Sequence, residues 1–201
     1  MKQFRHLLVA TLSAVLLQLC VPEGNSAPVL GKTTFVVEIG SADYSSRGLG
    51  DGTYYRVSFY KKFLDYFEWG PGLTFYQTDD FNYPQRKRNL PDNPVNELTD
   101  YNPALSLRVN MPIHAIWRAY LGSRLGVHFV EWSYIQPYES IIDSQDFTAF
   151  GLDVYIGTKL GSSSFPLGLQ GEMGVTHVSQ KLDDQSPRGL YFGAGVYLEF
   201  N

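Results

Sequence analysis

The stretch GVTHVSQKLDD contains a histidine and a serine whose spacing could support nucleophilic chemistry. A serine hydroxyl is a weak nucleophile until a neighbouring base takes its proton, and imidazole commonly serves as that base. Side chains two positions apart on a β-strand lie on the same face, so a strand through His177 and Ser179 would place the two groups side by side. Asp183 or Asp184 could then serve as a third member that orients the histidine.

The same residues also fit an interpretation without chemistry. A strand that leaves an apolar layer commonly ends in polar residues, and a histidine and a serine at such a boundary need no catalytic role. The sequence therefore leaves two hypotheses for His177 and Ser179, a catalytic pair or the polar end of a strand.

Three other groups of residues could bind ligands. The glycine-rich GLGDG, residues 48–52, has the composition of a phosphate-binding loop, but it enters a strand and not a helix, so an external turn explains it. The basic QRKR, residues 85–88, fits a solvated loop or a contact with lipopolysaccharide phosphates. His114 and His128 each lack a second ligand at the spacing of a metal site, so the sequence predicts no metal.

The first residues predict a secretory signal peptide. The apolar run after Lys2 and Arg5 is too short for a membrane-spanning helix, and small and helix-breaking residues follow it. Cleavage after Ser26 divides the chain into a signal peptide, residues 1–26, and a mature domain, residues 27–201. The single cysteine lies in the signal, so the mature chain can form no disulfide. A formal net charge of −4 argues against nucleic acid as a partner.

The mature sequence alternates between apolar and polar residues with period two, which is the pattern of β-strands. In the clearest case, from Leu190 to Phe200, every second residue is apolar, and the opposite row includes Tyr191 and Glu199. The same alternation predicts seven further strands, around Phe35–Ile39, Tyr55–Tyr60, Trp69–Thr78, Leu105–Asn110, Ala115–Trp132, Phe150–Gly157 and Leu167–Thr176.

The connections between these strands are alternately long and short. The longest runs from Asp79 to Asn102, and the short ones include NMPIH and GSSSFP. Long loops at one end and tight turns at the other, with strands of about ten residues, are typical of membrane barrels. The sequence therefore predicts an all-β fold, an eight-stranded antiparallel up-and-down transmembrane β-barrel.

A soluble, lipocalin-like barrel could produce the same alternation with the apolar row facing inward. Three features favour the membrane barrel. Aromatic residues gather near strand ends, as at Tyr66 and Trp69. Leu198 and Phe200 lie in a segment similar to the C-terminal signal that the barrel assembly machinery reads. The polar row carries charges of both signs that could pair in a narrow lumen, namely Glu38, Arg56, Arg108, Arg118, Arg124, Asp153, Lys159, Glu172 and Glu199.

This pattern resembles the small eight-stranded outer-membrane protein superfamily, and the resemblance covers the whole mature region, residues 27–201. A second, local resemblance is to the lipid A 3-O-deacylase family, whose barrels carry a His-x-Ser pair on the outer wall of a late strand. His177 and Ser179 match that pair. Gln180 stands where the family has an asparagine, and Tyr191 stands where an ungapped alignment places the group that orients the histidine.

These observations predict an integral outer-membrane β-barrel protein that has no open pore and acts through its structure or its external loops. The alternative is a lipid A 3-O-deacylase, a serine ester hydrolase that acts on lipopolysaccharide in the outer leaflet. Its catalytic pair would be His177 and Ser179, with Gln180 and Asp184 as helpers. In either case we expect no cofactor, signal cleavage on the way to the outer membrane, insertion by the barrel assembly machinery, and contacts with outer-membrane lipids and lipopolysaccharide.

Overall fold

The chain forms a closed antiparallel β-barrel. The computed structural model describes residues 32–43, 51–64, 66–78, 96–135, 142–161, 165–179 and 188–200. These ranges contain the strands β1 (Thr33–Asp43), β2 (Asp51–Lys62), β3 (Phe67–Thr78), β4 (Asn96–His114), β5 (Trp117–Ile135), β6 (Ile142–Leu160), β7 (Leu167–Val178) and β8 (Arg188–Phe200). Each strand pairs with the next, and β8 pairs with β1, so the predicted eight-stranded fold is confirmed. Among the described residues, no helix is long and apolar enough to cross a membrane.

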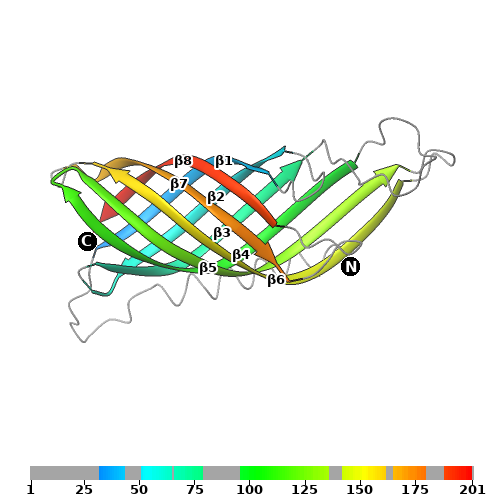
Figure 1. The fold of residues 1–201 in the computed structure, drawn as a ribbon, viewed down its shortest axis with the longest axis horizontal. Helices are drawn as coiled ribbons and strands as arrows, with labels where there is room; N and C mark the ends of the chain where they lie inside the picture. The colour runs from blue at the N-terminus through cyan, green and yellow to red at the C-terminus, as the bar shows by residue number, and fades with distance from the viewer. Residues whose placement is uncertain are drawn as a thin grey trace.

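The two ends of the barrel differ in what they carry. We call one the turn end, because it holds Lys32, Phe200 and the connections that follow β2, β4 and β6. The opposite end holds the other four connections, and we call it the loop end. Figure 1 shows the strands inclined to the long axis, with the C-terminal end of β8 at the turn end on the left. The predicted signal peptide, residues 1–26, lies outside the described residues.

Strands β4 and β6 are longer than the predicted ranges Leu105–Asn110 and Phe150–Gly157, and Figure 1 shows both of them and β5 reaching beyond their neighbours at the loop end. The loop predicted from Asp79 to Asn102 is wrong at its C-terminal boundary. Strand β4 already begins at Asn96, which pairs with Tyr134 of β5. The loop-end segments NELTD of β4 and DSQD of β6 are mostly polar on both faces, so pairing continues where the alternation gives no signal. The predicted turn NMPIH is also wrong, because it belongs to β4 and the turn lies at Ala115 and Ile116.

The two faces of each strand meet different surroundings. On β8, Tyr191 and Tyr197 are each 4% exposed, whereas Phe192 is 64% exposed. The apolar row therefore faces outward, and the soluble alternative with an apolar lumen is wrong. The exposed row on the other strands includes Val37, Ile39, Tyr55, Val57, Leu105, Leu107, Leu121, Leu125, Leu152, Val154, Ile156, Leu169, Met173 and Val175.

Inward tyrosines pack on inward glycines of neighbouring strands. A Cβ atom added at Gly122 would meet the ring of Tyr155, and one added at Gly157 would meet the ring of Tyr120. The same relation holds for Gly40 with Tyr54, Gly52 with Tyr76, Gly168 with Tyr197, and Gly174 with Tyr191, and the hydroxyl of Tyr54 also reaches Gly193 on β8, two strands away. Glycine at these positions lets a ring lie flat against the wall, so the rings fill the narrow lumen.

Candidate functional site

The His177 and Ser179 pair lies on the outer wall at the loop end. His177 is the penultimate residue of β7, Ser179 follows the strand, and both side chains are exposed. They continue the outward row of Met173 and Val175, as the sequence predicts. The amide of Ser179 donates a hydrogen bond of 2.8 Å to the carbonyl oxygen of Phe150, so the chain is still attached to β6 at the serine.

Most of the residues around this pair are apolar, but an arginine is opposite the histidine on one side. His177 is paired with Leu152 of β6, which is 46% exposed, and with Arg188 of β8. Phe150 and Leu190, on the strands at either side, are 68% and 65% exposed, and Val175 is 48% exposed. A histidine and a serine within such a patch would be next to acyl chains if this wall lies in a bilayer. Their catalytic role stays a prediction.

Gln180, Asp183 and Asp184, the proposed helpers of the pair, lie outside the described residues. Tyr191, which the ungapped alignment places beside the histidine, lies on the other side of the wall. It is 4% exposed, and its hydroxyl donates a hydrogen bond of 3.1 Å to Oε1 of Glu172 in the lumen. Tyr191 therefore does not orient an imidazole on the outer wall.

The centre of the lumen is a network of buried charges around Glu172. Its Oε1 atom accepts hydrogen bonds from Nη1 of Arg56 at 2.8 Å and from Nη2 of Arg124 at 3.0 Å. Arg56 also donates to Glu38 at 3.0 Å, and Arg124 donates to Asp153 at 2.9 Å. These five groups come from β1, β2, β5, β6 and β7, so the network joins strands that are not neighbours.

A second charged cluster lies toward the turn end. Arg108 donates to Glu68 at 2.5 Å, and the ammonium group of Lys159 lies 3.2 Å from the same carboxylate. At the mouth, Arg118 and Glu199 form a partly exposed ion pair at 3.0 Å. All nine charged residues that the alternation assigns to the polar row thus have partners of opposite sign, as predicted.

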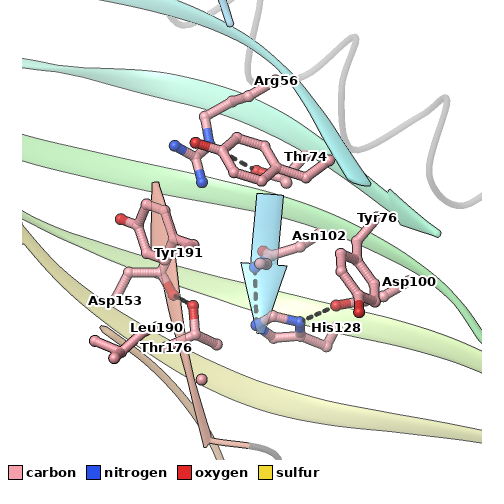
Figure 2. A pocket seen from close by; sticks show the side chains of 13 residues that line it. Arg56, Thr74, Tyr76, Asp100, Asn102, His128, Asp153, Thr176, Leu190 and Tyr191 are labelled. Atoms are coloured by element: carbon pink, nitrogen blue, oxygen red, sulfur yellow. Dashed lines mark hydrogen bonds and ion pairs between the residues drawn. The ribbon is translucent and has the colours of Figure 1, made fainter. Parts of the chain in front are cut away.

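Sequence reasoning missed a cluster at the loop end of the lumen, which Figure 2 shows. His128 on β5 is 1% exposed and lies between two side chains of β4. Its Nδ1 atom is 2.6 Å from Oδ2 of Asp100, and Nδ2 of Asn102 is 2.8 Å from Nε2. We call Asp100, Asn102 and His128 the loop-end cluster. Asp100 and Asn102 fall within the predicted loop that ends at residue 102, so the sequence did not place them in the lumen. Both continue the inward row of β4 that includes Ser106.

The cavities found in the lumen lie toward its two ends. One of about 20 Å³ borders the loop-end cluster, and one of about 230 Å³ lies at the turn end between residues that include Glu68 and Arg118. Arg124 and Glu172 lie between them and are 1% and 5% exposed. Side chains therefore separate the two cavities. Within the described residues, no group of three or more histidine, cysteine, aspartate or glutamate side chains could hold a metal ion.

Comparisons with known proteins concern the fold. No protein-family model matches the sequence, and no curated protein matches it. Neisserial surface protein A superposes with a TM-score of 0.55 at 17% identity, over 88% of this chain and 100% of that chain. The N-terminal barrel domain of Pseudomonas aeruginosa OprF and the attachment invasion locus protein Ail of Yersinia pestis each give a TM-score of 0.48 at 14% identity, over 85% of this chain and 99% of theirs.

The likeness to Neisserial surface protein A supports the architecture and not a shared partner or activity, because identity at this level shows the fold alone. The comparisons add no support for the resemblance to lipid A deacylases. The chain therefore has the fold of the small eight-stranded outer-membrane β-barrel proteins.

Proposed function

We propose that this chain is an integral outer-membrane protein whose barrel is a closed scaffold for its external connections. One observation carries the proposal: the outer wall is apolar and exposed, while the lumen is filled by paired charges and tyrosine rings. An exposed apolar band is stable in hydrocarbon and unfavourable in water. A lumen whose centre is occupied by Arg124 and Glu172 leaves no room for a conduction path.

The proposed orientation puts the turn end in the periplasm and the loop end outside the cell. The connections at the loop end include the longest one, residues 79–95, which contains the basic segment QRKR. Basic side chains bind phosphate through charge-assisted hydrogen bonds, so lipopolysaccharide and outer-membrane lipids are the partners we propose for these connections. Signal cleavage and insertion by the barrel assembly machinery belong to the same proposal.

Two measurements test the closed scaffold. The refolded chain should migrate faster in SDS before heating than after it, because a closed barrel pairs its backbone groups internally. In a planar lipid bilayer it should give no steady conductance. A stable ohmic current from the purified chain would contradict the scaffold and favour a pore.

A second candidate function is lipid A 3-O-deacylation. The observation that favours it is the exposure of both His177 and Ser179 on the outward side of the barrel, next to the apolar residues Leu152 and Val175. A base next to a hydroxyl at that place would meet the acyl esters of the outer leaflet. The mass of lipid A from cells with and without the protein tests this activity. Loss of one hydroxyacyl chain supports the enzyme, and identical masses remove it.

A further inference from the structure

The cavity at the turn end is large enough for a small molecule and is lined mostly by polar side chains. Its volume is about 230 Å³, compared with about 20 Å³ for the cavity at the loop end. Its lining includes Thr34 of β1, Asn110 of β4 and Arg118 of β5, together with Lys32 and Lys62. Thr34 and Asn110 belong to the buried inward rows of their strands, so the cavity lies within the mouth of the lumen and not on the outer wall.

A row of charged side chains crosses four neighbouring strands beside this cavity. The register places Lys62 of β2 opposite Glu68 of β3, and Glu68 opposite Arg108 of β4. The amide of Lys62 donates a hydrogen bond of 3.2 Å to the carbonyl oxygen of Lys32, which makes Lys32 the next member of the row. The ammonium group of Lys159 also donates to Glu68, at 3.2 Å. Four basic side chains therefore accompany one carboxylate.

The second carboxylate of the lining does not cancel this positive charge. Glu199 forms an ion pair with Arg118 at 3.0 Å, so these two side chains compensate each other. Even without Lys159, the described charges in the lining and on Arg108 are four cations and two carboxylates. An excess of positive charge at the mouth of a cleft attracts anions.

A buried acceptor in the wall of the cavity adds a second requirement. Asn110 is 8% exposed, and its Oδ1 atom has no hydrogen-bond partner among the described residues. The side-chain amide of Asn110 donates to Glu68, which fixes the orientation of the group and leaves Oδ1 unpaired. A buried acceptor without a partner is costly. A ligand that completes this site therefore carries a hydrogen-bond donor as well as negative charge.

We propose that this cavity binds a phosphate group to which a hydrogen-bond donor is attached. Phosphate has three strong acceptor oxygens, which match the three cationic side chains of the lining, Lys32, Lys62 and Arg118. The donor bonds to Oδ1 of Asn110. Two compounds combine these groups, namely hydrogen phosphate with its P–OH group and the phosphoethanolamine head group with its ammonium. The second source rests on the proposed function, because it requires the turn end to lie at the periplasmic leaflet.

Phosphorus NMR tests the site on the refolded full chain in an uncharged glycoside detergent. The resonance of inorganic phosphate broadens when the ion binds to a slowly tumbling micelle, and sulfate is added as a competitor at constant ionic strength. Sulfate resembles phosphate in size and charge but carries no proton at neutral pH, so it cannot donate to Asn110. We expect saturable broadening by phosphate and competition by sulfate that is about tenfold weaker or less, because the buried acceptor stays unpaired.

Three variants make the test specific to the cavity. Lys32→Gln and Lys62→Gln each remove one positive charge from the lining and should weaken the binding of phosphate. Lys61→Gln is the matched control, because Lys61 precedes Lys62 on β2 and belongs to the outward row of Tyr55 and Val57, so binding should be unchanged. Asn110→Ala should weaken the binding of phosphate more than that of sulfate, so that the preference disappears. Heat-dependent migration in SDS shows that each variant is folded.

Soluble head groups distinguish the two sources of phosphate. Glycerophosphoethanolamine retains the phosphate and the ammonium donor, whereas the quaternary ammonium of glycerophosphocholine has no N–H group. Tighter binding of glycerophosphoethanolamine than of inorganic phosphate assigns the lipid head group, and the reverse order assigns the free ion. The choline compound should bind more weakly than the ethanolamine compound in either case. These measurements do not depend on the orientation of the barrel, so their failure leaves the closed scaffold to its own tests.

Three outcomes would overturn the proposal. Competition by sulfate or chloride as strong as the binding of phosphate would show a nonspecific attraction of anions to a basic mouth. Binding that Lys32→Gln and Lys62→Gln both leave unchanged would place the phosphate elsewhere on the barrel. Absence of saturable broadening with the unmodified chain would exclude the site, and that measurement decides even if the variants fail to refold.

Discussion

The lumen and the outer wall consist of alternate residues of the same strands, yet they differ in how each charge is accommodated. In the lumen, Arg108 and Arg124 are 0% and 1% exposed, and each donates to a carboxylate. On the outer wall, large apolar side chains such as Leu125, which is 61% exposed, form a continuous band. The polar pair His177 and Ser179 lies at the edge of that band. In this barrel the charged side chains are buried and the large apolar side chains are exposed, which is the reverse of the usual arrangement in a soluble protein.

This contrast has an energetic consequence. A charge in the lumen depends on its partners, because an unpaired charge in a low-dielectric interior costs several kcal/mol. A residue on the outer wall depends on the solvent it faces, and its cost follows from its depth in the bilayer. A substitution in the lumen should therefore be most costly where it removes a charged partner, and one on the outer wall where it places a charge deep in the bilayer.

The largest effect should come from Glu172, because two arginines donate to it. Glu172→Gln keeps the shape of the side chain but leaves Arg56 and Arg124 without this charge. Arg56 and Arg124 keep Glu38 and Asp153 as partners, so the loss is that of two charge-assisted hydrogen bonds, each typically worth about 1.5–3 kcal/mol. Urea unfolding of the barrel in lipid vesicles, followed by gel migration or tryptophan fluorescence, measures the loss.

Glu199→Gln is the control for the lumen. Glu199 pairs with Arg118 at the turn end, where the two side chains are 11% and 30% exposed. A pair that water reaches typically contributes only about 0.2–1 kcal/mol, so this variant should unfold almost as the parent does. Equal losses for Glu172→Gln and Glu199→Gln would mean that the central network does not hold the barrel together.

The second effect concerns the outer wall. Val154 lies outward near the middle of the apolar band and is 51% exposed. An arginine at the bilayer midplane costs about 2–4 kcal/mol, so Val154→Arg should reduce both the folded yield and the free energy of unfolding in vesicles. Ile113→Arg is the control, because Ile113 is 54% exposed at the turn end, where the same change should cost about 0–1 kcal/mol. Similar costs at both positions would place the bilayer elsewhere on the wall.

These two faces also show how much of the molecule its sequence could predict. Period-two alternation predicted nine of the inward charges, because each strand carries its own signal, but it missed Glu68 and Asp100, which lie outside the predicted strands. It could not pair them, since Arg56 and Glu172 are separated by 116 positions and meet only when the barrel closes. The loop-end cluster was missed because Asp100 precedes the apolar part of β4. The catalytic helpers after Ser179 lie outside the described residues, so that part of the candidate site stays a prediction.

A third, smaller effect distinguishes the faces without any charge. Gly122→Ala adds a methyl group that would meet the buried ring of Tyr155, and overpacking of this kind typically costs about 1–3 kcal/mol. Gly171 faces outward, and the nearest atoms to an added Cβ are 3.8 Å and 4.0 Å away. Gly171→Ala should therefore leave the unfolding free energy within about 0.5 kcal/mol of the parent. A larger loss at Gly171 than at Gly122 would contradict the packing of rings on glycines.

The smallest effect on stability should come from the polar pair at the edge of the band. His177→Ala and Ser179→Ala truncate exposed side chains, and substitutions at such positions usually change stability by less than about 0.5 kcal/mol. The hydrogen bond from Ser179 to the carbonyl oxygen of Phe150 is donated by the backbone amide, so alanine retains it. Heat-dependent migration in SDS should therefore be unchanged in both variants. A barrel that unfolds in either one would assign the pair a structural role.

Activity, in contrast, should depend on this pair if the second candidate function is correct. Each single alanine variant should then leave the acyl chains of lipid A intact, because the nucleophile and its base act as one unit, and the double variant should be hardly worse than either. Gln180→Asn sharpens the test, since it restores the amide of the family that the pair resembles and should raise deacylation. Ser123→Ala, at an outward-facing serine of β5, is the control and should keep the parental rate. If the unmodified chain leaves lipid A unchanged in both detergent and bilayers, His177 and Ser179 are the polar end of a strand, and the contrast between a paired lumen and an apolar wall accounts for the whole described barrel.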